Sequence, residues 1–193
     1  MKYFIEVTLL PSVEIPLYFL WEKVYQQIHL ALVEIKKEDG SVTVGVSFPA
    51  YDARRNELGS KLRLFSQTFT ELEELAISQW LSRLKDYVHI TGIRDIPNKT
   101  KGYAVFKRVQ TKSSKMRLAR RKAKREGIDL DAAIKVLSFY QEKTSNLPYI
   151  RLKSLSSGKW YRLMVSSSKV EKIQNVGTFS TYGLGACRSV PLF

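Results

Sequence analysis

The sequence predicts an α+β protein, because segments with strand and helix periodicity alternate in its first half and a basic helix with short strands follows in its second half. Apolar residues make up 44% of the chain and aromatic residues 11%, which is typical of a globular protein. A length of 193 residues suits one domain of ordinary size or two small ones. We therefore expect a folded chain with a substantial core.

The first four predicted elements lie between residues 2 and 66. Residues 2–10 alternate as a strand, and a helix is predicted from about Pro16, which suits a first helical turn, to about Val33. Within that helix an apolar residue recurs at every fourth position, at Leu20, Val24, Ile28 and Leu32. After the turn KKEDGS, residues 42–49 (VTVGVSFP) and residues 62–66 are predicted strands.

A second helix and a fourth strand complete this half. Thr68 followed three residues later by Glu71 is a capping box, and the helix is predicted to end near Asp86. Residues 87–96 alternate as a strand. The order strand–helix–strand–strand–helix–strand is the split βαβ, or ferredoxin-like, pattern. We therefore expect a ferredoxin-like domain over residues 1–96.

A smaller C-terminal domain is expected over residues 97–193. Residues 97–103 (PNKTKGY) are a polar linker with proline and glycine, which predicts a domain boundary near residue 97. Beyond it we expect a strand over residues 104–110, a basic helix at about 114–126, a short helix after Asp129 and a strand-rich tail.

The charge of the chain is concentrated in one segment. The net charge is +14, and between Lys99 and Arg125 there are 12 basic residues and no acidic ones, whereas the rest of the chain holds 20 basic and 18 acidic residues. Such a block favours a polyanion as partner, and nucleic acid is the usual one. The alternative is a solvated basic surface that serves solubility.

The basic helix has one cationic face. At 100° per residue, five side chains fall within about 140° of arc, namely Arg117, Arg120, Arg121, Lys124 and Arg125. Met116, Ala119 and Ala123 lie opposite them, a small apolar face suited to packing. A basic amphipathic helix can also lie on a membrane surface, but this one has no Leu, Phe or Trp opposite the arginines to insert. Nucleic acid is therefore favoured over a membrane.

Arg108 and Gln110 lie just before this helix. At a spacing of two they share one side of the expected strand. Arginine can contact O6 and N7 of guanine, and glutamine can contact N6 and N7 of adenine. Outward-facing Arg and Gln are also common on strands that do not contact nucleic acid, so this pair alone is only a weak indication of base recognition.

The cysteine count and the N-terminus indicate a cytoplasmic protein. A single cysteine, Cys187, excludes an internal disulfide framework. The first residues predict a strand and a turn rather than a signal peptide, and no run of 18 apolar residues occurs. Two distant histidines and no paired-carboxylate spacing predict neither a metal site nor a cofactor.

A nuclease with this sequence would rely on acid–base chemistry, for which histidine is the natural proton carrier. His29 lies at the border of the apolar stripe of the first helix, and a structural role without chemistry is its simpler interpretation. His89 is out of phase with its apolar neighbours and is expected to be an exposed strand residue. On RNA, the 2′-OH of the substrate can be the nucleophile.

The C-terminal half offers further polar and aromatic candidates. Ser154, Ser156, Ser157 and Gly158 fit a turn between strands, and the same groups can hold a ribose hydroxyl or a phosphate. Trp160 and Tyr161 follow, and an aromatic ring beside a polar turn can stack on a base. Tyr182 precedes a glycine and is either a core aromatic or a phenol directed at phosphate.

Over essentially its full length the chain resembles the CRISPR-associated repeat-cleaving endoribonucleases of type I-F systems. The resemblance rests on the segments IHLALV around His29, GVSFP at 45–49, RVQ at 108–110 with the arginine-rich helix after it, LPYIRLKSLSSG at 147–158 and TYGL at 181–184. It implies a ferredoxin-like domain, a smaller domain with the basic helix, and no cofactor or metal.

The resemblance also implies a reaction and a partner. Members of this family bind the stem-loop of the CRISPR repeat and cut at the 3′ base of the stem, leaving a 2′,3′-cyclic phosphate and a 5′-OH. The enzyme then stays bound to the guide RNA and so joins the other subunits of the type I-F surveillance complex. The alternative is a non-catalytic hairpin-binding subunit of such a complex.

The resemblance implies a role for each matching residue. His29 would deprotonate the 2′-OH, Ser154 would hold that hydroxyl, and Tyr182 would orient the histidine. Arg108 and Gln110 would contact stem base edges, and Tyr161 would stack on the terminal base pair. The remaining RNA-binding candidates are Ser156 and the helix residues Arg117, Arg120, Arg121, Lys124 and Arg125. Ala119, Lys122 and Lys124 stand in a run that can be richer in arginine, so the preferred repeat is not fixed by the resemblance.

Overall fold

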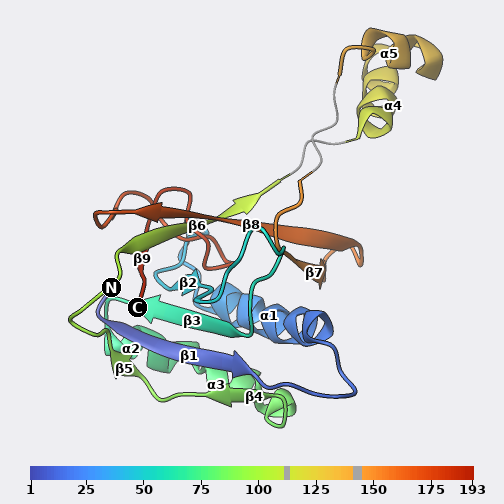
Figure 1. Ribbon diagram of the computed structural model, residues 1–193. Coiled ribbons are helices and arrows are strands. Elements are labelled where there is room, and N and C mark those ends of the chain that lie inside the picture. Colours follow the sequence, from blue (N-terminus) through green and yellow to red (C-terminus); the bar gives the residue numbers. More distant parts are fainter. Residues whose placement is uncertain (111–113, 141–144) are drawn as a thin grey trace. The chain divides into compact units, whose positions relative to one another are not determined.

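The computed structural model describes residues 1–110, 114–140 and 145–193 (Figure 1). The contacts divide the chain into two compact units. The larger unit comprises Met1–Val109 and Leu147–Phe193, and the smaller one comprises Gln110–Asn146. The smaller unit is therefore an insertion between two segments of the larger one. The predicted α+β class is confirmed, since helices accompany two antiparallel sheets.

The first sheet of the larger unit is antiparallel and contains β1 (Tyr3–Leu9), β2 (Gly45–Ser47), β3 (Lys61–Ser66), β4 (Val88–Ile90) and β5 (Arg94–Asp95). Its order is β2-β3-β1-β4, and β5 also pairs with β1. The prediction of one strand over residues 87–96 was wrong. The backbone N–H of Glu6 on β1 donates to Oγ1 of Thr91 at 3.0 Å, so a side chain replaces the regular ladder between β4 and β5.

Helix α1 (Leu17–Glu34) lies between the two sheets of the larger unit (Figure 1). It confirms the predicted first helix, with Pro16 as its N-cap. The predicted apolar stripe is buried, and Trp21 and Tyr25 are buried with it. Because α1 packs against both sheets, a residue at the edge of its buried face can reach elements from the C-terminal part of the chain.

The predicted second helix is broken at Ala76. Thr68 and Glu71 form the expected capping box of α2 (Phe69–Leu75), but α3 (Ile77–Trp80) and a 3₁₀ turn, η1 (Ser82–Leu84), follow it. On one continuous helix Leu75 and Ile77 would point about 200° apart. The left-handed conformation of Ala76, with φ of 45°, changes the direction of the chain so that both are buried. The prediction of one helix to Asp86 was therefore wrong.

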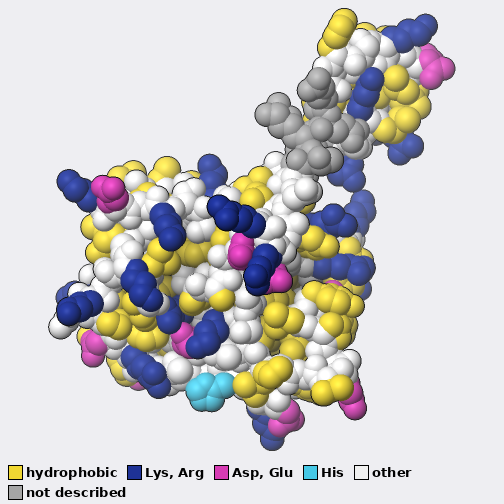
Figure 2. Space-filling view, viewed as in Figure 1, with side chains coloured by type: hydrophobic (Ala, Val, Ile, Leu, Met, Phe, Trp, Pro, Cys, Tyr) yellow, Lys and Arg dark blue, Asp and Glu magenta, His cyan; other side chains and the backbone are white. Residues whose placement is uncertain are grey.

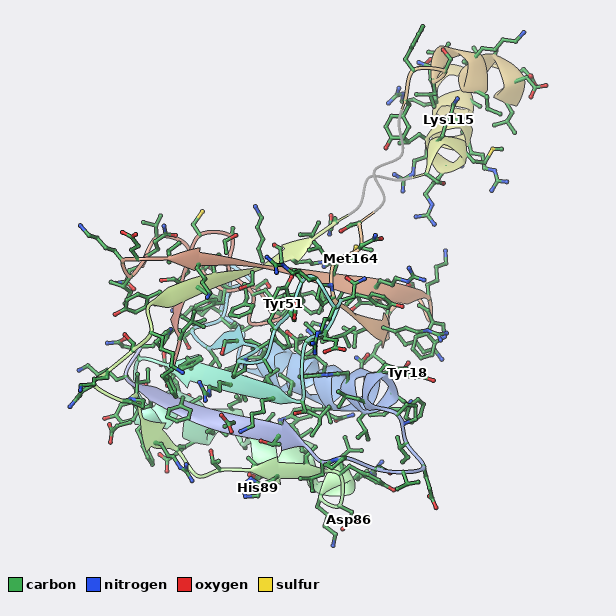
Figure 3. All side chains as sticks on the ribbon, in the orientation of Figure 1. Tyr18, Tyr51, Asp86, His89, Lys115 and Met164 are labelled. Atoms are coloured by element: carbon green, nitrogen blue, oxygen red, sulfur yellow. The ribbon has the colours of Figure 1, made fainter. Side chains whose placement is uncertain are left out.

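The second sheet, antiparallel like the first, contains β6 (Tyr103–Val109), β7 (Tyr149–Lys153), β8 (Trp160–Val170) and β9 (Val190–Pro191) in the order β7-β8-β6-β9. Tyr51 lies between the two sheets (Figure 3), and its hydroxyl donates to the carbonyl of Val165 at 2.9 Å. Val42, expected in a strand, instead forms an isolated bridge with Phe179. Both interactions join segments far apart in the sequence into one body.

The smaller unit is a pair of helices, α4 (Lys115–Glu126) and α5 (Leu130–Val136). The Ser114 side chain caps α4 at its N-terminus, and Gly127 ends it in a left-handed conformation with φ of 64°. Asp129 caps α5. Ala119 of α4 and Ala133 of α5 are fully buried, so small side chains allow the two helices to pack closely.

The break at Ala76 leads to a test of the fold. An L-residue pays a steric penalty in the left-handed region, and a β-branched one pays more. We expect Ala76→Gly to keep or raise the free energy of unfolding, and Ala76→Val to lower it by about 1–2 kcal/mol. Urea denaturation followed by circular dichroism measures both. If Ala76→Val matched the wild type, residue 76 would not adopt this conformation in solution.

Candidate active site

His29 lies on α1 and is half-buried. Its Nδ1 is 2.8 Å from the backbone carbonyl oxygen of Thr181. A carbonyl oxygen can only accept a hydrogen bond, so Nδ1 carries the proton and donates it. The lone pair of the neutral ring is then on Nε2, the nitrogen left to act as a base.

Tyr182 covers one face of the His29 ring. The two rings are stacked with centroids 4.2 Å apart and planes 5° from parallel. The Tyr182 hydroxyl is 2.8 Å from the Tyr161 hydroxyl, and the buried hydroxyl of Tyr25 donates to the Tyr182 carbonyl at 2.8 Å. Tyr182 is therefore held at both its backbone and its ring, and it limits how the imidazole can rotate.

The loop that carries Tyr182 is fastened to the first sheet at Gly183. The backbone N–H of Val46 on β2 donates to the Gly183 carbonyl at 2.8 Å, and Gly183 has a φ of 66°. A Cβ atom at this position would collide with Cγ2 of Val46. Only glycine meets both the backbone and the space requirements here, which explains why the tyrosine is followed by glycine.

Arg108 on β6 faces the same group of rings. Its guanidinium carbon is 5.0 Å from the centroid of the Tyr182 ring and 5.8 Å from that of Tyr161. Burial lowers the pKa of His29, the hydrogen bond to Thr181 opposes this, and the positive charge of Arg108 lowers the pKa further. The net shift is downward from the usual value, so His29 is neutral at neutral pH and available as a base.

Ser154 begins the turn between β7 and β8. Its Oγ accepts hydrogen bonds from the Ser157 hydroxyl at 2.9 Å and the Ser157 N–H at 3.3 Å, and it is 3.2 Å from the Ser156 hydroxyl. The turn closes through the Gly158 N–H, which donates to the Ser154 carbonyl. These bonds present a cluster of hydroxyl groups, which can bind a ribose hydroxyl or a phosphate oxygen.

One pocket of about 460 Å³ gathers these side chains. The candidates that line it come from α1, β6, the β7–β8 turn, β8 and the C-terminal loop, and they are His29, Arg108, Ser154, Ser156, Tyr161 and Tyr182. Segments up to about 150 residues apart in the sequence thus meet at one place. A base, a hydroxyl cluster and a guanidinium in one pocket can together bind a phosphodiester and remove a proton beside it.

The other RNA-binding candidates belong to the smaller unit. β6 ends at Val109, so Gln110 lies beyond the strand that was expected to carry it next to Arg108. All five cationic residues of the predicted face of α4 are exposed, while Ala119 is buried and Ala123 half-buried. Met116, expected on the packing face, is 45% exposed. Arg125 forms an ion pair with Glu126 at 2.8 Å.

Some residues of the site were not identified from the sequence. Tyr25 was not among the candidates; it lies one helical turn before His29, and its hydroxyl bonds to the same loop. Of the two neighbouring aromatics, Tyr161 points into the pocket, and Trp160 is 46% exposed with the Arg151 guanidinium 4.4 Å from its ring centroid. His89 is exposed on β4, at the outer edge of the first sheet, as expected (Figure 3).

The described residues were also searched for a metal site and for a membrane-spanning helix. Within residues 1–110, 114–140 and 145–193, no three His, Cys, Asp or Glu side chains lie close enough to hold a metal ion together. Over the same ranges, no helix has the length and apolar character to cross a membrane. On the face of the larger unit seen in Figure 2, Lys and Arg side chains are widespread, and acidic side chains lie scattered among them.

The lowered pKa of His29 can be measured directly. Nuclear magnetic resonance titration of the imidazole protons in the free protein, assigned with a His29→Asn variant, should give a pKa below 6.5. Arg108→Gln removes a nearby positive charge and should raise this pKa. Lys107→Gln, at the exposed neighbouring position, should leave it unchanged. A wild-type value at or above 6.5 would contradict the described environment.

Known proteins match the whole chain. A family model described as CRISPR-associated protein (Cas_Csy4) matches residues 4–193. Two relatives named CRISPR-associated endonuclease Cas6/Csy4, from Escherichia coli (strain UTI89 / UPEC) and Pseudomonas aeruginosa (strain UCBPP-PA14), are 32% and 31% identical over 193 residues, with 100% of each chain covered. A solved RAMP protein that binds different RNA substrates aligns over 100% of both chains at 15% identity with a TM-score of 0.37, too low to bear on fold or function. The chain belongs to the family of CRISPR-associated proteins described as Cas_Csy4.

Proposed function

We propose that this protein is an endoribonuclease that processes CRISPR repeat RNA, binding the repeat stem-loop and cutting at the 3′ base of the stem without a metal ion. Membership of the Cas_Csy4 family and two relatives named as endonucleases support the general activity. The observation that carries the mechanism is the state of His29, whose Nδ1 donates to the Thr181 carbonyl and whose pKa is lowered.

The proposed reaction is an attack by the 2′-OH of the nucleotide before the cut on the adjacent phosphorus. Nε2 of His29 takes the proton of that hydroxyl, a bond forms between the 2′ oxygen and phosphorus, and the bond from phosphorus to the 5′ oxygen breaks. The products are a 2′,3′-cyclic phosphate and a 5′-OH, the latter after the departing oxygen takes a proton. No water enters the first step, and a neutral histidine suffices as base.

Each neighbour of His29 has a proposed task. The Ser154 hydroxyl, supported by Ser156 and Ser157, would hold the 2′-OH close to the imidazole. Tyr182 would keep the histidine ring oriented, in keeping with its near-parallel stacking on that ring. Arg108 lines the same pocket, where its guanidinium can contact a phosphate or a base edge at the foot of the stem.

The basic helix α4 would bind the stem. Its exposed face offers Arg117, Arg120, Arg121, Lys124 and Arg125 to phosphates and base edges, and Gln110 precedes it. An ordinary A-form major groove is too narrow for side chains, so the helix needs a groove that opens toward the loop of the hairpin. Tyr161 would stack on the last base pair of the stem, although its hydroxyl already contacts Tyr182.

The proposal extends to the domains of the protein and to its partners. We infer a ferredoxin-like domain over residues 1–96, supported by the β2-β3-β1-β4 order, and an RNA-binding domain over residues 97–193. The product hairpin would stay bound, and through it the protein would join the other subunits of a type I-F complex in the cytoplasm. A subunit that binds the hairpin without cutting it is the alternative that the next experiment separates.

Replacement of His29 should separate cutting from binding. Wild-type protein in excess EDTA should cut end-labelled repeat RNA once, at the 3′ base of the stem. His29→Ala should lower the rate constant at least 100-fold, the usual contribution of a general base, and leave hairpin affinity within about twofold. A His89→Ala control should cut normally, since that residue is exposed on β4. A 2′-deoxy substitution at the cut should block the reaction and spare binding.

The outcomes of this experiment are distinct. Tight binding without any cut by the wild type would favour the non-catalytic subunit. Equal loss of cutting and binding in His29→Ala would mean that the residue is structural. Cleavage of the deoxy substrate would rule out attack by the 2′-OH.

Loss of arginines from α4 should weaken binding in a salt-dependent manner. Each phosphate contact releases counterions, so Arg117→Ala with Arg121→Ala should lower affinity for the hairpin and flatten its dependence on salt by about one to two units of log–log slope. The matched control, Arg54→Ala with Arg55→Ala, removes the same charge from an exposed turn of the larger unit. An unchanged slope in the α4 variant would remove that helix from the interface.

A further inference from the structure

A second and larger pocket adjoins the candidate active site in the larger unit. Its volume is about 800 Å³, compared with about 460 Å³ for the pocket that contains His29. The two pockets share three lining residues, Gln26, Lys153 and Leu155. Gln26 precedes His29 by one helical turn, and Lys153 and Leu155 flank Ser154. The second pocket is therefore continuous with the place where the scissile phosphate would bind.

The lining of this pocket combines three kinds of group. Trp80 and Trp160 supply aromatic faces, on which unpaired bases stack. Gln26, Gln27 and Gln79 supply amide groups that can both donate to and accept from a base edge.

Lys23, Arg83 and Lys153 add positive charge suited to phosphates, and Glu22, which pairs with Lys23 at 3.3 Å, is the acidic residue among the lining. This combination fits a nucleotide better than an apolar ligand or an anion alone.

The position of the pocket selects which nucleotide can occupy it. The proposed cut lies at the 3′ base of the stem, so the nucleotide before it is paired and its base is stacked in the helix. The nucleotide after it is single-stranded and can turn its base into a neighbouring pocket. We propose that this pocket is a subsite for the first unpaired nucleotide on the 3′ side of the cut, with Trp160 as its stacking residue and Arg83 as a phosphate contact. This inference rests on the proposed function.

Trp160 is suited to this role by its exposure. Its side chain is 46% exposed, and Arg151 covers it at 4.4 Å, an arrangement that leaves ring surface for a base. Leu155, at the junction of the two pockets, is 70% exposed. Because every base has an aromatic face, stacking here would accept any of the four bases.

The test compares hairpins that differ only on the 3′ side. All carry a 2′-deoxy nucleotide at the cut so that they bind without reacting. One ends at the stem, one continues for two nucleotides, and one continues for two nucleotides with the first base absent. Wild-type protein should bind the complete extension about tenfold more tightly than either of the others, the amount expected for one stacked base.

Two variants and two matched controls locate the effect. Trp160→Ala and Arg83→Ala should reduce the advantage of the extension to about twofold or less and leave affinity for the shortest hairpin unchanged, which also shows that they are folded. Tyr18→Ala removes an exposed aromatic from α1 outside the pocket (Figure 3), and Lys85→Ala removes a charge two residues from Arg83. Both controls should keep the full advantage.

A fluorescent base gives an independent signal. 2-Aminopurine placed directly 3′ of the cut should be quenched on binding to the wild type and to Tyr18→Ala, and should stay bright with Trp160→Ala. A hairpin that binds well but gains nothing from its extension would overturn the subsite and leave the proposed function intact. An advantage that persists in both pocket variants would also overturn it. No binding of any hairpin would overturn the proposed function, and the subsite with it.

Discussion

Two hydrogen bonds from a single helix hold the candidate active site together. Tyr25 and His29, one turn apart on α1, donate to the consecutive carbonyls of Tyr182 and Thr181. Tyr25 is fully buried, where an unpaired hydroxyl would be costly, so the loop has little freedom to move away. The bond from His29 fixes the tautomer of the imidazole. One contact thus positions the loop, and the other determines which ring nitrogen is basic.

The remaining structure supports this contact from several directions. The loop is held on its far side by Val46 on β2, at a glycine where no larger residue fits. Tyr51 joins the first sheet region to β8, and β8 carries Tyr161 to the Tyr182 hydroxyl. Burial lowers the pKa of His29, and the positive charge of Arg108 on β6 lowers it further, so both favour the neutral imidazole. The pocket is therefore a product of both sheets and of the helix between them.

The sequence predicted best those features that depend only on residues close together in the chain. The capping box at Thr68, the course of α1 and the short helix after Asp129 were predicted and are confirmed. The single helix to Asp86 was wrong because the interval between Leu75 and Ile77 does not fit one helical face, and that conflict was visible in the sequence. The role of Tyr25 could not be deduced, since an aromatic in an apolar stripe looks like core whether or not its hydroxyl has a distant partner. For the same reason, the prediction that His29 is catalytic came from the family resemblance rather than from the sequence pattern.

The insertion of Gln110–Asn146 between β6 and β7 has a consequence for how such a protein can change. The helix pair has its own caps and its own packing through Ala119 and Ala133, and both strands that bear it are paired with β8. Recombination or design can therefore replace this segment without changing the positions of the residues around His29. Under the proposed function, the helix pair could change to bind a hairpin of new sequence while the residues that cut the RNA stay the same. Enzymes of this kind could then follow changes in the sequence of the repeat.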